Sequence, residues 1–342
     1  MRLFKRLWFA LLAASILAVP GVGMAAAEVN IYSARIEALI KPLLDRFSEE
    51  TGIKVNLVTG KADELLNRLR HEGRNSPADI LLTVDAGNLH RAKEMGVIQA
   101  FRSETLEGRV PPQYRDADGY WYGLSLRARP IMYAKDKVDP AMLSTYEALT
   151  DPRWRGKICI RSSGNIYNQS MVSSMIATNG EQATEAWARG LVRNLARPPR
   201  GGDRDQIKAV AAGQCEIAIA NTYYLIGMLN SNDSSDRQVA ERIGVFWPNQ
   251  QDRGVHMNVS GAALTQAARN KDNAIRLIEF LSTEASQQWY AEANGEYPVR
   301  ADVAVGELLK ALGEFKADPI EMGKLGEFSP QAVRLMDRAG WQ

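Results

Sequence analysis

Two consecutive tyrosines, Tyr223 and Tyr224, directly follow an apolar, β-branched segment that is typical of a buried strand. A third, Tyr167, lies a few residues beyond a second such segment at 157–161, and Tyr32 ends the first predicted strand of the chain. In open α/β sheets the ligand binds at the carboxyl ends of the strands. The four tyrosines are therefore candidates for a ligand site, with ordinary aromatic packing as the alternative.

The phenol side chains of these tyrosines could bind a hard metal ion. A phenolate is a strong anionic oxygen donor, and highly charged cations prefer oxygen donors. A free phenol has a pKa of about 10, so it binds a metal at neutral pH only where the metal displaces its proton. Fe³⁺ is acidic enough to do this, whereas Ca²⁺ and Mg²⁺ usually take carboxylates and water. Since the chain has 11 tyrosines but only 3 histidines, the composition favours ferric iron.

An alternation of strand and helix patterns must position these side chains. The sequence predicts strands over 29–32, 54–58 and 79–84, each followed by an amphipathic helix, and the alternation restarts at Lys157. Such βα order predicts mainly parallel sheets with helices on both faces. With 342 residues the chain is long enough for about two domains. We therefore expect an α/β protein of two lobes, each with its own sheet.

The chain is expected to cross between the lobes twice, so that each lobe is discontinuous. An extended stretch over 120–133 leads from the first unit to the second, and another near 242–248 leads back. Two-lobed proteins of this kind bind a ligand in the cleft and close by hinge bending. The predicted boundaries give a first lobe of residues 28–123 and 249–301 and a second lobe of residues 124–248 and 302–342, with helices at its end.

The first 27 residues have the pattern of a cleaved secretory signal peptide. A basic start with Arg2, Lys5 and Arg6 precedes an uncharged apolar run, and the alanines at 25–27 form an A-x-A cleavage pattern. The apolar run is shorter than the ~20 residues that a membrane span needs. Loss of the three basic residues would change the formal net charge from +2 to −1. We therefore expect a periplasmic protein without the basic excess that is typical of nucleic-acid binders.

The chain has two cysteines, Cys159 and Cys215, in or beside the predicted strands that precede the tyrosines. In an oxidising compartment, a single pair on neighbouring strands predicts one disulfide. Two separate buried thiols, which behave as small apolar side chains, are the alternative. Since no C-x-x-C spacing is present, neither a redox site nor a zinc site is indicated.

At the tyrosines and in several other segments the sequence resembles the periplasmic ferric-ion-binding proteins of ABC importers. The resemblance extends over nearly the whole chain after the signal segment and rests on short motifs in matching order. These motifs are Val29–Ser33, Phe47–Val55, Pro77–Asp85, Arg153–Lys157, Asn221–Tyr224 and Gly295–Val299. The resemblance implies a type II solute-binding fold with two lobes and delivery of Fe³⁺ to an inner-membrane permease. We expect the protein to be a monomer.

The resemblance also implies roles for single residues. Tyr223 and Tyr224 match the paired tyrosine ligands of the family, and Tyr167 matches a ligand that some members add from the same lobe. Arg127 and Arg129 match the basic hinge stretch that lies near the metal and a synergistic anion such as carbonate. The two arginines could instead pair with carboxylates in the hinge.

The first lobe departs from the family's best-known pattern. Where many members have a histidine ligand the chain has Ile36, and where some have a glutamate ligand it has Val84, followed by Asp85. Three phenolates would neutralise Fe³⁺ but leave an octahedral ion short of donors, which carbonate or water could supply with an arginine as a charge-assisted donor. Tyr32 is a candidate for a further ligand or for a hydrogen bond behind the ligands. Asp85 is a candidate for a ligand or for the cap of the next helix.

Two other classes of function are open. The chain contains no G-x-S-x-G, H-E-x-x-H or P-loop motif, so an enzyme is disfavoured. A carrier of the same fold for an organic or oxyanion ligand, such as a phosphonate, sulfate or polyamine, is the closer alternative. Oxyanion carriers use backbone amides and hydroxyl groups and have no need of converging phenols.

Overall fold

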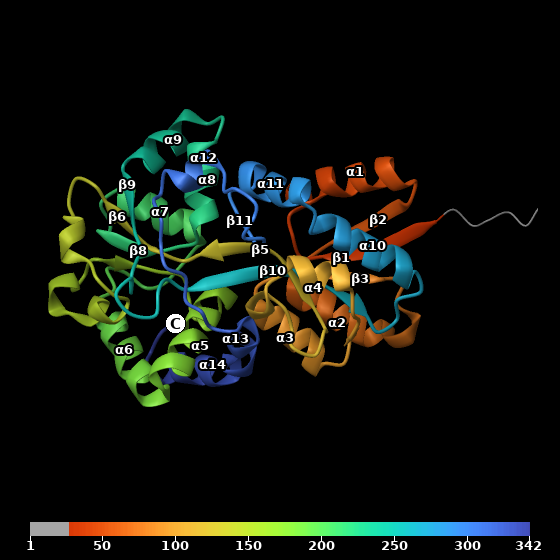
Figure 1. The fold of residues 1–342 in the computed structure, drawn as a ribbon. Coiled ribbons are helices and arrows are strands. Elements are labelled where there is room, and N and C mark those ends of the chain that lie inside the picture. The colour runs from red at the N-terminus through yellow and green to blue at the C-terminus, as the bar shows by residue number, and fades with distance from the viewer. Residues whose placement is uncertain (1–26) are drawn as a thin grey trace, which may run out of the picture.

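The computed structural model describes residues 27–342, and Figure 1 shows two halves joined through long strands at the centre. The predicted signal peptide lies outside the described residues except for Ala27. The first sheet contains β1 (Glu28–Ser33), β2 (Lys54–Thr59), β3 (Ile80–Val84), β4 (Ile98–Gln99), β5 (Tyr122–Ala128), β10 (Met257–Thr265) and β11 (Tyr297–Pro298). The second contains β6 (Ile131–Ala134), β7 (Ile158–Cys159), β8 (Ile217–Ile219) and β9 (Ile243–Phe246). The predicted two-lobed α/β architecture is confirmed.

Helices cover both sheets. Those of the first half are α1 (Lys41–Thr51), α2 (Ala62–Glu72), α3 (Ala86–Glu94), α4 (Glu104–Arg109), α10 (Lys271–Leu281) and α11 (Glu284–Ala293). Those of the second half are α5 (Ile166–Asn179), α6 (Glu181–Arg193), α7 (Asp203–Ala211), α8 (Thr222–Leu229) and α9 (Ser234–Glu241). The short α12 (Glu307–Lys310), α13 (Met322–Glu327) and α14 (Ser329–Arg338) complete the chain. The predicted helix after the first strand ends at Gly52 with a φ of 71°, because glycine adopts this conformation without a steric penalty.

The prediction that the sheets are mainly parallel is wrong. β1 pairs in parallel with β2 and β3, and β7 with β8, as βα order predicts. The pairs that involve β5, β6 and β10 are antiparallel. The reason is the path between the lobes: β10 enters the first sheet from the second lobe, so it runs against β3, which points towards that lobe. Local sequence does not encode this direction.

Two crossings connect the sheets. β5 pairs in the first sheet as far as Ala128 and β6 begins the second at Ile131, so the outward crossing lies between these residues. The return crossing lies between Phe246 and Met257. The predicted lobe boundaries after residues 123 and 248 stay predictions, because a lobe is defined by what moves together and not by its sheet alone.

The C-terminal helices contact both halves. α13 packs against α3 of the first half and α5 of the second, and α14 packs against α5 and α6. A Cβ atom at Gly326 would come within 2.1 Å of the Cβ of His90, so this close packing of α13 on α3 requires glycine. The C-terminal segment therefore touches the first lobe as well as the second.

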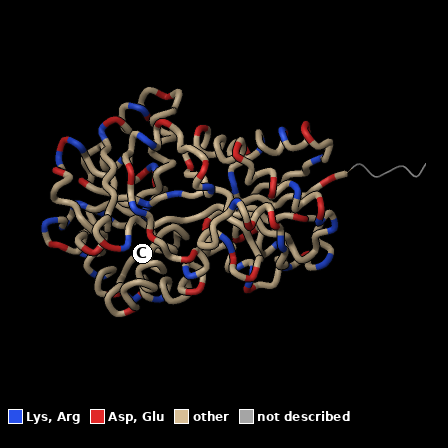
Figure 2. The backbone as a smooth tube through the Cα atoms, viewed as in Figure 1, with Lys and Arg blue, Asp and Glu red and all other residues tan. Residues whose placement is uncertain are grey.

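The predicted disulfide is confirmed. Cys159 and Cys215 are bonded, with their Cα atoms 5.9 Å apart, and they join the neighbouring parallel strands β7 and β8. Figure 2 shows that Lys and Arg alternate with Asp and Glu along the tube in both halves, so neither half has a single sign of charge. No helix within residues 27–342 is long and apolar enough to cross a membrane.

Candidate metal site

Three of the four candidate tyrosines lie together where β7 and β8 lead into helices. Tyr167 is the second residue of α5, and Tyr223 and Tyr224 are the second and third residues of α8. The Tyr223 hydroxyl donates a hydrogen bond to Tyr167 Oη at 3.2 Å, and the rings of Tyr223 and Tyr224 lie 4.2 Å apart. All three side chains are partly exposed. The structure thus brings the three phenols into one group.

The disulfide holds the two strands that precede these tyrosines. Cys159 is the last residue of β7, and Cys215 lies two residues before β8. The link closes a loop of 56 residues, which should stabilise the fold by about 4 kcal/mol in the chain-entropy model. The relative position of α5 and α8 therefore depends on a covalent link as well as on strand pairing.

Burial controls the protonation of the tyrosines. It raises the pKa of Tyr167 above that of a free phenol, the nearby Tyr224 adds to the effect, and Arg127 opposes it. Burial also raises the pKa of Tyr223, together with its two tyrosine neighbours. Tyr167 and Tyr223 are therefore neutral at pH 7 unless a cation displaces their protons.

Arg127, on β5, lies beside the tyrosines. Its guanidinium carbon is 5.9 Å from the ring centres of both Tyr167 and Tyr223, and the residue is 1% exposed. One terminal nitrogen donates to Ser260 Oγ. Its Nε and Nη1 atoms have no hydrogen-bond partner among the described residues. A buried cation with unused donors next to phenols is a suitable environment for an anion.

Arg129 is used differently. Its Nη1 atom donates to Asp203 Oδ2 and to Asn221 Oδ1, each at 2.9 Å, and its Nη2 atom donates to Asn168 Oδ1 at 2.7 Å. The Arg129 and Asp203 side chains are 1% and 0% exposed. Of the two alternatives for the hinge arginines, pairing with a carboxylate is therefore the one observed for Arg129.

A second buried ion pair lies near the group, and sequence reasoning missed it. Arg35 donates to Glu296 Oε2 at 2.7 Å and to Ser260 Oγ at 2.8 Å. Burial alone would raise the pKa of Glu296, but Arg35 and Arg127 outweigh it, so the net pKa is lowered and the carboxylate stays ionised. A signal was available in the sequence, since Arg35 lies three residues after the first predicted strand, at the carboxyl end of the sheet where ligands bind.

Tyr32 and Asp85 are not part of the tyrosine group. The Tyr32 hydroxyl donates to Glu72 of α2 at 2.9 Å, and its side chain is 1% exposed. Asp85 precedes α3 as its cap and accepts a hydrogen bond from the Gly87 amide at 2.8 Å. Both its oxygens are used, because Ser170 of α5 donates to Oδ1 at 2.6 Å and Asn258 donates to Oδ2 at 2.7 Å.

The first lobe lacks the family's best-known ligands at two positions. Ile36, at the position of the histidine ligand, is 71% exposed, and Val84, at the position of the glutamate ligand, ends β3. Within residues 27–342, no group of three or more His, Cys, Asp and Glu side chains could hold a metal ion. A cavity of about 430 Å³ is lined by Ala34 and Arg91 of the first half and by Arg161 of the second.

Comparison with known proteins decides the family. Residues 43–319 match the family model described as bacterial extracellular solute-binding protein. The chain belongs to this family. Iron uptake protein A1 of Synechocystis sp. is 49% identical over 315 residues, covering 92% of this chain and 88% of the relative. The Fe(3+)-binding periplasmic protein of Serratia marcescens is 30% identical over 97% of this chain and 96% of its own.

A solved structure agrees with these relatives. A Trichodesmium protein in complex with iron and citrate ligands superposes with a TM-score of 0.90 and 47% identity, covering 92% of this chain and all of that chain. The expected resemblance to ferric-ion-binding proteins is thus confirmed. These relatives are named as binding and uptake proteins, in agreement with the expectation that the chain is not an enzyme.

Proposed function

We propose that the protein binds Fe³⁺ in the cleft between its lobes through the phenolates of Tyr167, Tyr223 and Tyr224. The observation that carries this proposal is the contact among the three phenols, two of which meet at 3.2 Å between hydroxyl oxygens. Phenolate oxygens that converge at one point suit a hard cation that needs several oxygen donors. The relatives named for iron uptake and ferric-iron binding support the same ligand.

Charge balance makes ferric iron a better ligand than a divalent cation. Three phenolates carry three negative charges and would neutralise Fe³⁺, whereas a divalent ion would leave an excess negative charge in a partly buried site. A divalent ion is also a weaker acid, so it would displace fewer of the phenol protons. We expect the phenols to lose about one proton each as the ion binds.

A synergistic anion completes the coordination in this proposal. An octahedral ion with three phenolate ligands has three positions left, and a bidentate anion such as carbonate would fill two of them. Arg127 is suited to hold it because its Nε and Nη1 atoms lack partners among the described residues, whereas both terminal nitrogens of Arg129 are engaged. Citrate, present with iron in the Trichodesmium structure, is an alternative anion of the same class.

The family and the fold support delivery of the bound iron to a transporter. The tyrosine-bearing lobe captures the ion, and the two crossings let the first lobe close over it. The signal-like pattern at residues 1–27 and the periplasmic relative support a periplasmic protein that delivers iron to an inner-membrane ABC permease as a monomer. Acid favours release, because protons compete with the ion for the phenolates.

The test is to add ferric citrate and bicarbonate to the purified protein and record its absorption spectrum. Phenolate-to-iron charge transfer should turn the sample orange-red, with one iron bound per chain. A colourless sample in which sulfate or a phosphonate raises the melting temperature would instead support an oxyanion carrier and contradict the proposal. A control with Ga³⁺, which has a similar charge and size but no charge-transfer band in the visible range, should compete with iron and remove the colour.

A further inference from the structure

We propose that the buried Arg129–Asp203 ion pair positions the three tyrosines and acts on iron binding only through them. This inference rests on the proposed iron site, and it assigns Arg129 and Asp203 to the support of the ligands and not to the anion. Such a pair does not contact the metal but orients the residues that do. Loss of such an orienting partner usually weakens metal binding.

One guanidinium joins the two helices that carry the tyrosines. Arg129 Nη2 donates to the side chain of Asn168, which directly follows Tyr167 in α5. Its Nη1 atom donates to the side chain of Asn221, the residue that directly precedes α8 and hence Tyr223. A displacement of Arg129 would therefore shift the first residues of both α5 and α8.

Asp203 closes this network. Its Oδ2 atom accepts from Arg129 at 2.9 Å and from the backbone amide of Asn221 at 2.8 Å, so the carboxylate fixes the start of α8 as well as the guanidinium. Asn168 in turn donates to the carbonyl groups of Arg161 at 2.9 Å and Ser162 at 3.1 Å, in the loop that leads to Tyr167. The loop before Tyr167 and the residue before α8 are thus both hydrogen-bonded to this network.

The network is also attached to the hinge. The backbone amide of Arg129 donates to the carbonyl of His256 at 3.0 Å, and its carbonyl accepts from the Tyr146 hydroxyl at 2.7 Å. Arg129 lies in the outward crossing and His256 in the return crossing. The tyrosine helices are therefore positioned relative to the point about which the lobes would close. A buried ion pair suits this task, because both terminal nitrogens of the planar guanidinium are engaged and fix several acceptors in one geometry.

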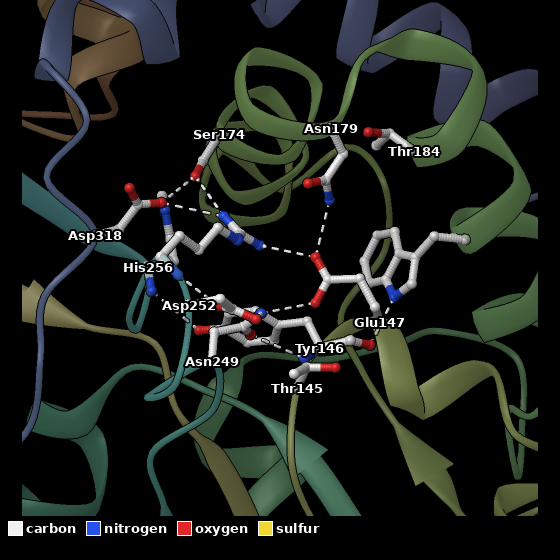
Figure 3. Close-up of polar contacts among 12 residues, drawn as sticks. Thr145, Tyr146, Glu147, Ser174, Asn179, Thr184, Asn249, Asp252, His256 and Asp318 are labelled. Atoms are coloured by element: carbon white, nitrogen blue, oxygen red, sulfur yellow. Dashed lines mark hydrogen bonds and ion pairs between the residues drawn. The ribbon is translucent and has the colours of Figure 1, made fainter.

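A matched control pair joins the return crossing to the C-terminal segment. Arg253 and Asp318 form another buried ion pair at 3.1 Å, with side chains 8% and 3% exposed. Figure 3 shows Asp318 beside Ser174 of α5, with Glu147 and Asn179 further along the same network. Ser174 lies seven residues after Tyr167, and within residues 27–342 the pair makes no hydrogen bond to a residue next to a proposed tyrosine ligand. Loss of this pair should affect folding but not the iron site.

The experiment compares Asp203→Asn with Asp318→Asn in the full-length mature protein, with ferric citrate and bicarbonate as the probe. Both variants lose one buried carboxylate, so both should melt at a lower temperature than the wild type. Asp203→Asn alone should lower the iron affinity about 10- to 100-fold and shift the charge-transfer band. An unchanged band and affinity in Asp203→Asn, or an equal loss in both variants, would overturn the proposal.

Arg129→Lys guards against a variant that does not fold. Lysine keeps the positive charge but cannot reach Asn168, Asn221 and Asp203 in one fork, so iron affinity should fall although the charge is retained. Crystal structures without iron give a readout that does not depend on metal binding. The contact between Tyr167 Oη and Tyr223 Oη should be lost in Asp203→Asn and kept in Asp318→Asn; a contact kept in both contradicts positioning. A colourless wild type would overturn the iron site, and these structures would still decide the positioning role.

Discussion

The candidate site has two faces with different kinds of ionisable group. The tyrosine face consists of Tyr167, Tyr223 and Tyr224, which are held by the second lobe. The arginine face consists of Arg35 and Arg127, which lie after β1 and on β5 of the first sheet. Both faces are at least partly buried, but the first carries acids that keep their protons and the second carries permanent cations.

The difference shows how burial acts on weak and strong ionisable groups. On the tyrosine face, burial raises the pKa of Tyr167 and Tyr223, so the cost of desolvation is avoided by keeping the proton. On the arginine face, burial alone would lower the pKa of Arg35, but the neighbouring Glu296 outweighs it and the cation persists. A metal ion would make the tyrosine face anionic, and an anion would then find its cation already in place.

The largest effect should come from pH. If three phenols each release a proton, iron affinity should fall by about a thousandfold for each pH unit below neutrality, since each proton contributes about tenfold. Competition against citrate at several pH values measures this slope after correction for the protonation of citrate. Tyr167→Phe should reduce the slope by one proton. A slope of one proton or less would mean that the tyrosine face does not bind the ion as phenolates.

The next largest effect should come from the loss of one phenol on the tyrosine face. Tyr223→Phe should abolish the orange-red colour and lower iron affinity by more than about 100-fold, because removal of a ligand costs more than removal of its supporting partner. Tyr290→Phe is a matched control. The guanidinium carbon of Arg35 lies 5.5 Å from the centre of the Tyr290 ring, and the Tyr290 hydroxyl has no hydrogen-bond partner in the described part of the chain. An equal iron affinity of Tyr223→Phe and Tyr290→Phe would mean that Tyr223 is not an iron ligand.

The tyrosine face could be predicted from the sequence because its geometry is local. Tyr167 and Tyr223 each lie within a few residues of a strand end, and the strand-to-helix pattern around them is short and clear. The disulfide was predictable for another reason, because a chain expected in an oxidising compartment has only these two cysteines in its sequence, each in or beside one of those two strands. That the phenols touch could not be derived from spacing, because it depends on which strands are neighbours.

On the arginine face, Arg127 was named from the family resemblance, but Arg35 was not predicted because its partner is distant in the sequence. Arg35 and Glu296 are separated by 261 residues and meet only because β11 joins the edge of the first sheet beside β5. Arg129 and Asp203 are separated by 74 residues, so the sequence offered a carboxylate partner for Arg129 only as an alternative and did not identify Asp203. The mainly parallel sheets were mispredicted for the same physical reason, because the direction of β10 follows from the return path between the lobes.

A smaller effect should come from Arg127. Arg127→Met should lower iron affinity about tenfold in the presence of bicarbonate, because a charge-assisted hydrogen bond to the anion contributes about 1.5–3 kcal/mol. In a bicarbonate-free buffer the affinity of the variant should be close to that of the wild type. Titration calorimetry under both conditions measures the difference. An equal loss with and without bicarbonate would mean that Arg127 acts on the tyrosines and not on the anion.

Asp85 should have the smallest effect on iron, although it is a buried acid near both faces. Burial raises its pKa to about 6, only partly offset by hydrogen bonds from Ser170, Gly87 and Asn258 and by the charge of Arg127. The folded pKa lies above the unfolded value of 3.8, so the folded state takes up the proton more readily. The stability that follows from this shift is present below about pH 4 and lost as the pH rises through 6, with a total of about 3 kcal/mol at most.

Asp85→Ala tests this assignment against that of a metal ligand. Because its oxygens are already bonded within the protein, the variant should keep the orange-red colour and the iron affinity of the wild type at pH 7.5. Urea unfolding of both proteins at pH 4.5 and 7.5 should show a larger advantage of the wild type at the lower pH. A colour change in the variant would place Asp85 among the ligands. A wild-type advantage that grows with pH would mean that the hydrogen bonds to the ionised carboxylate outweigh its burial.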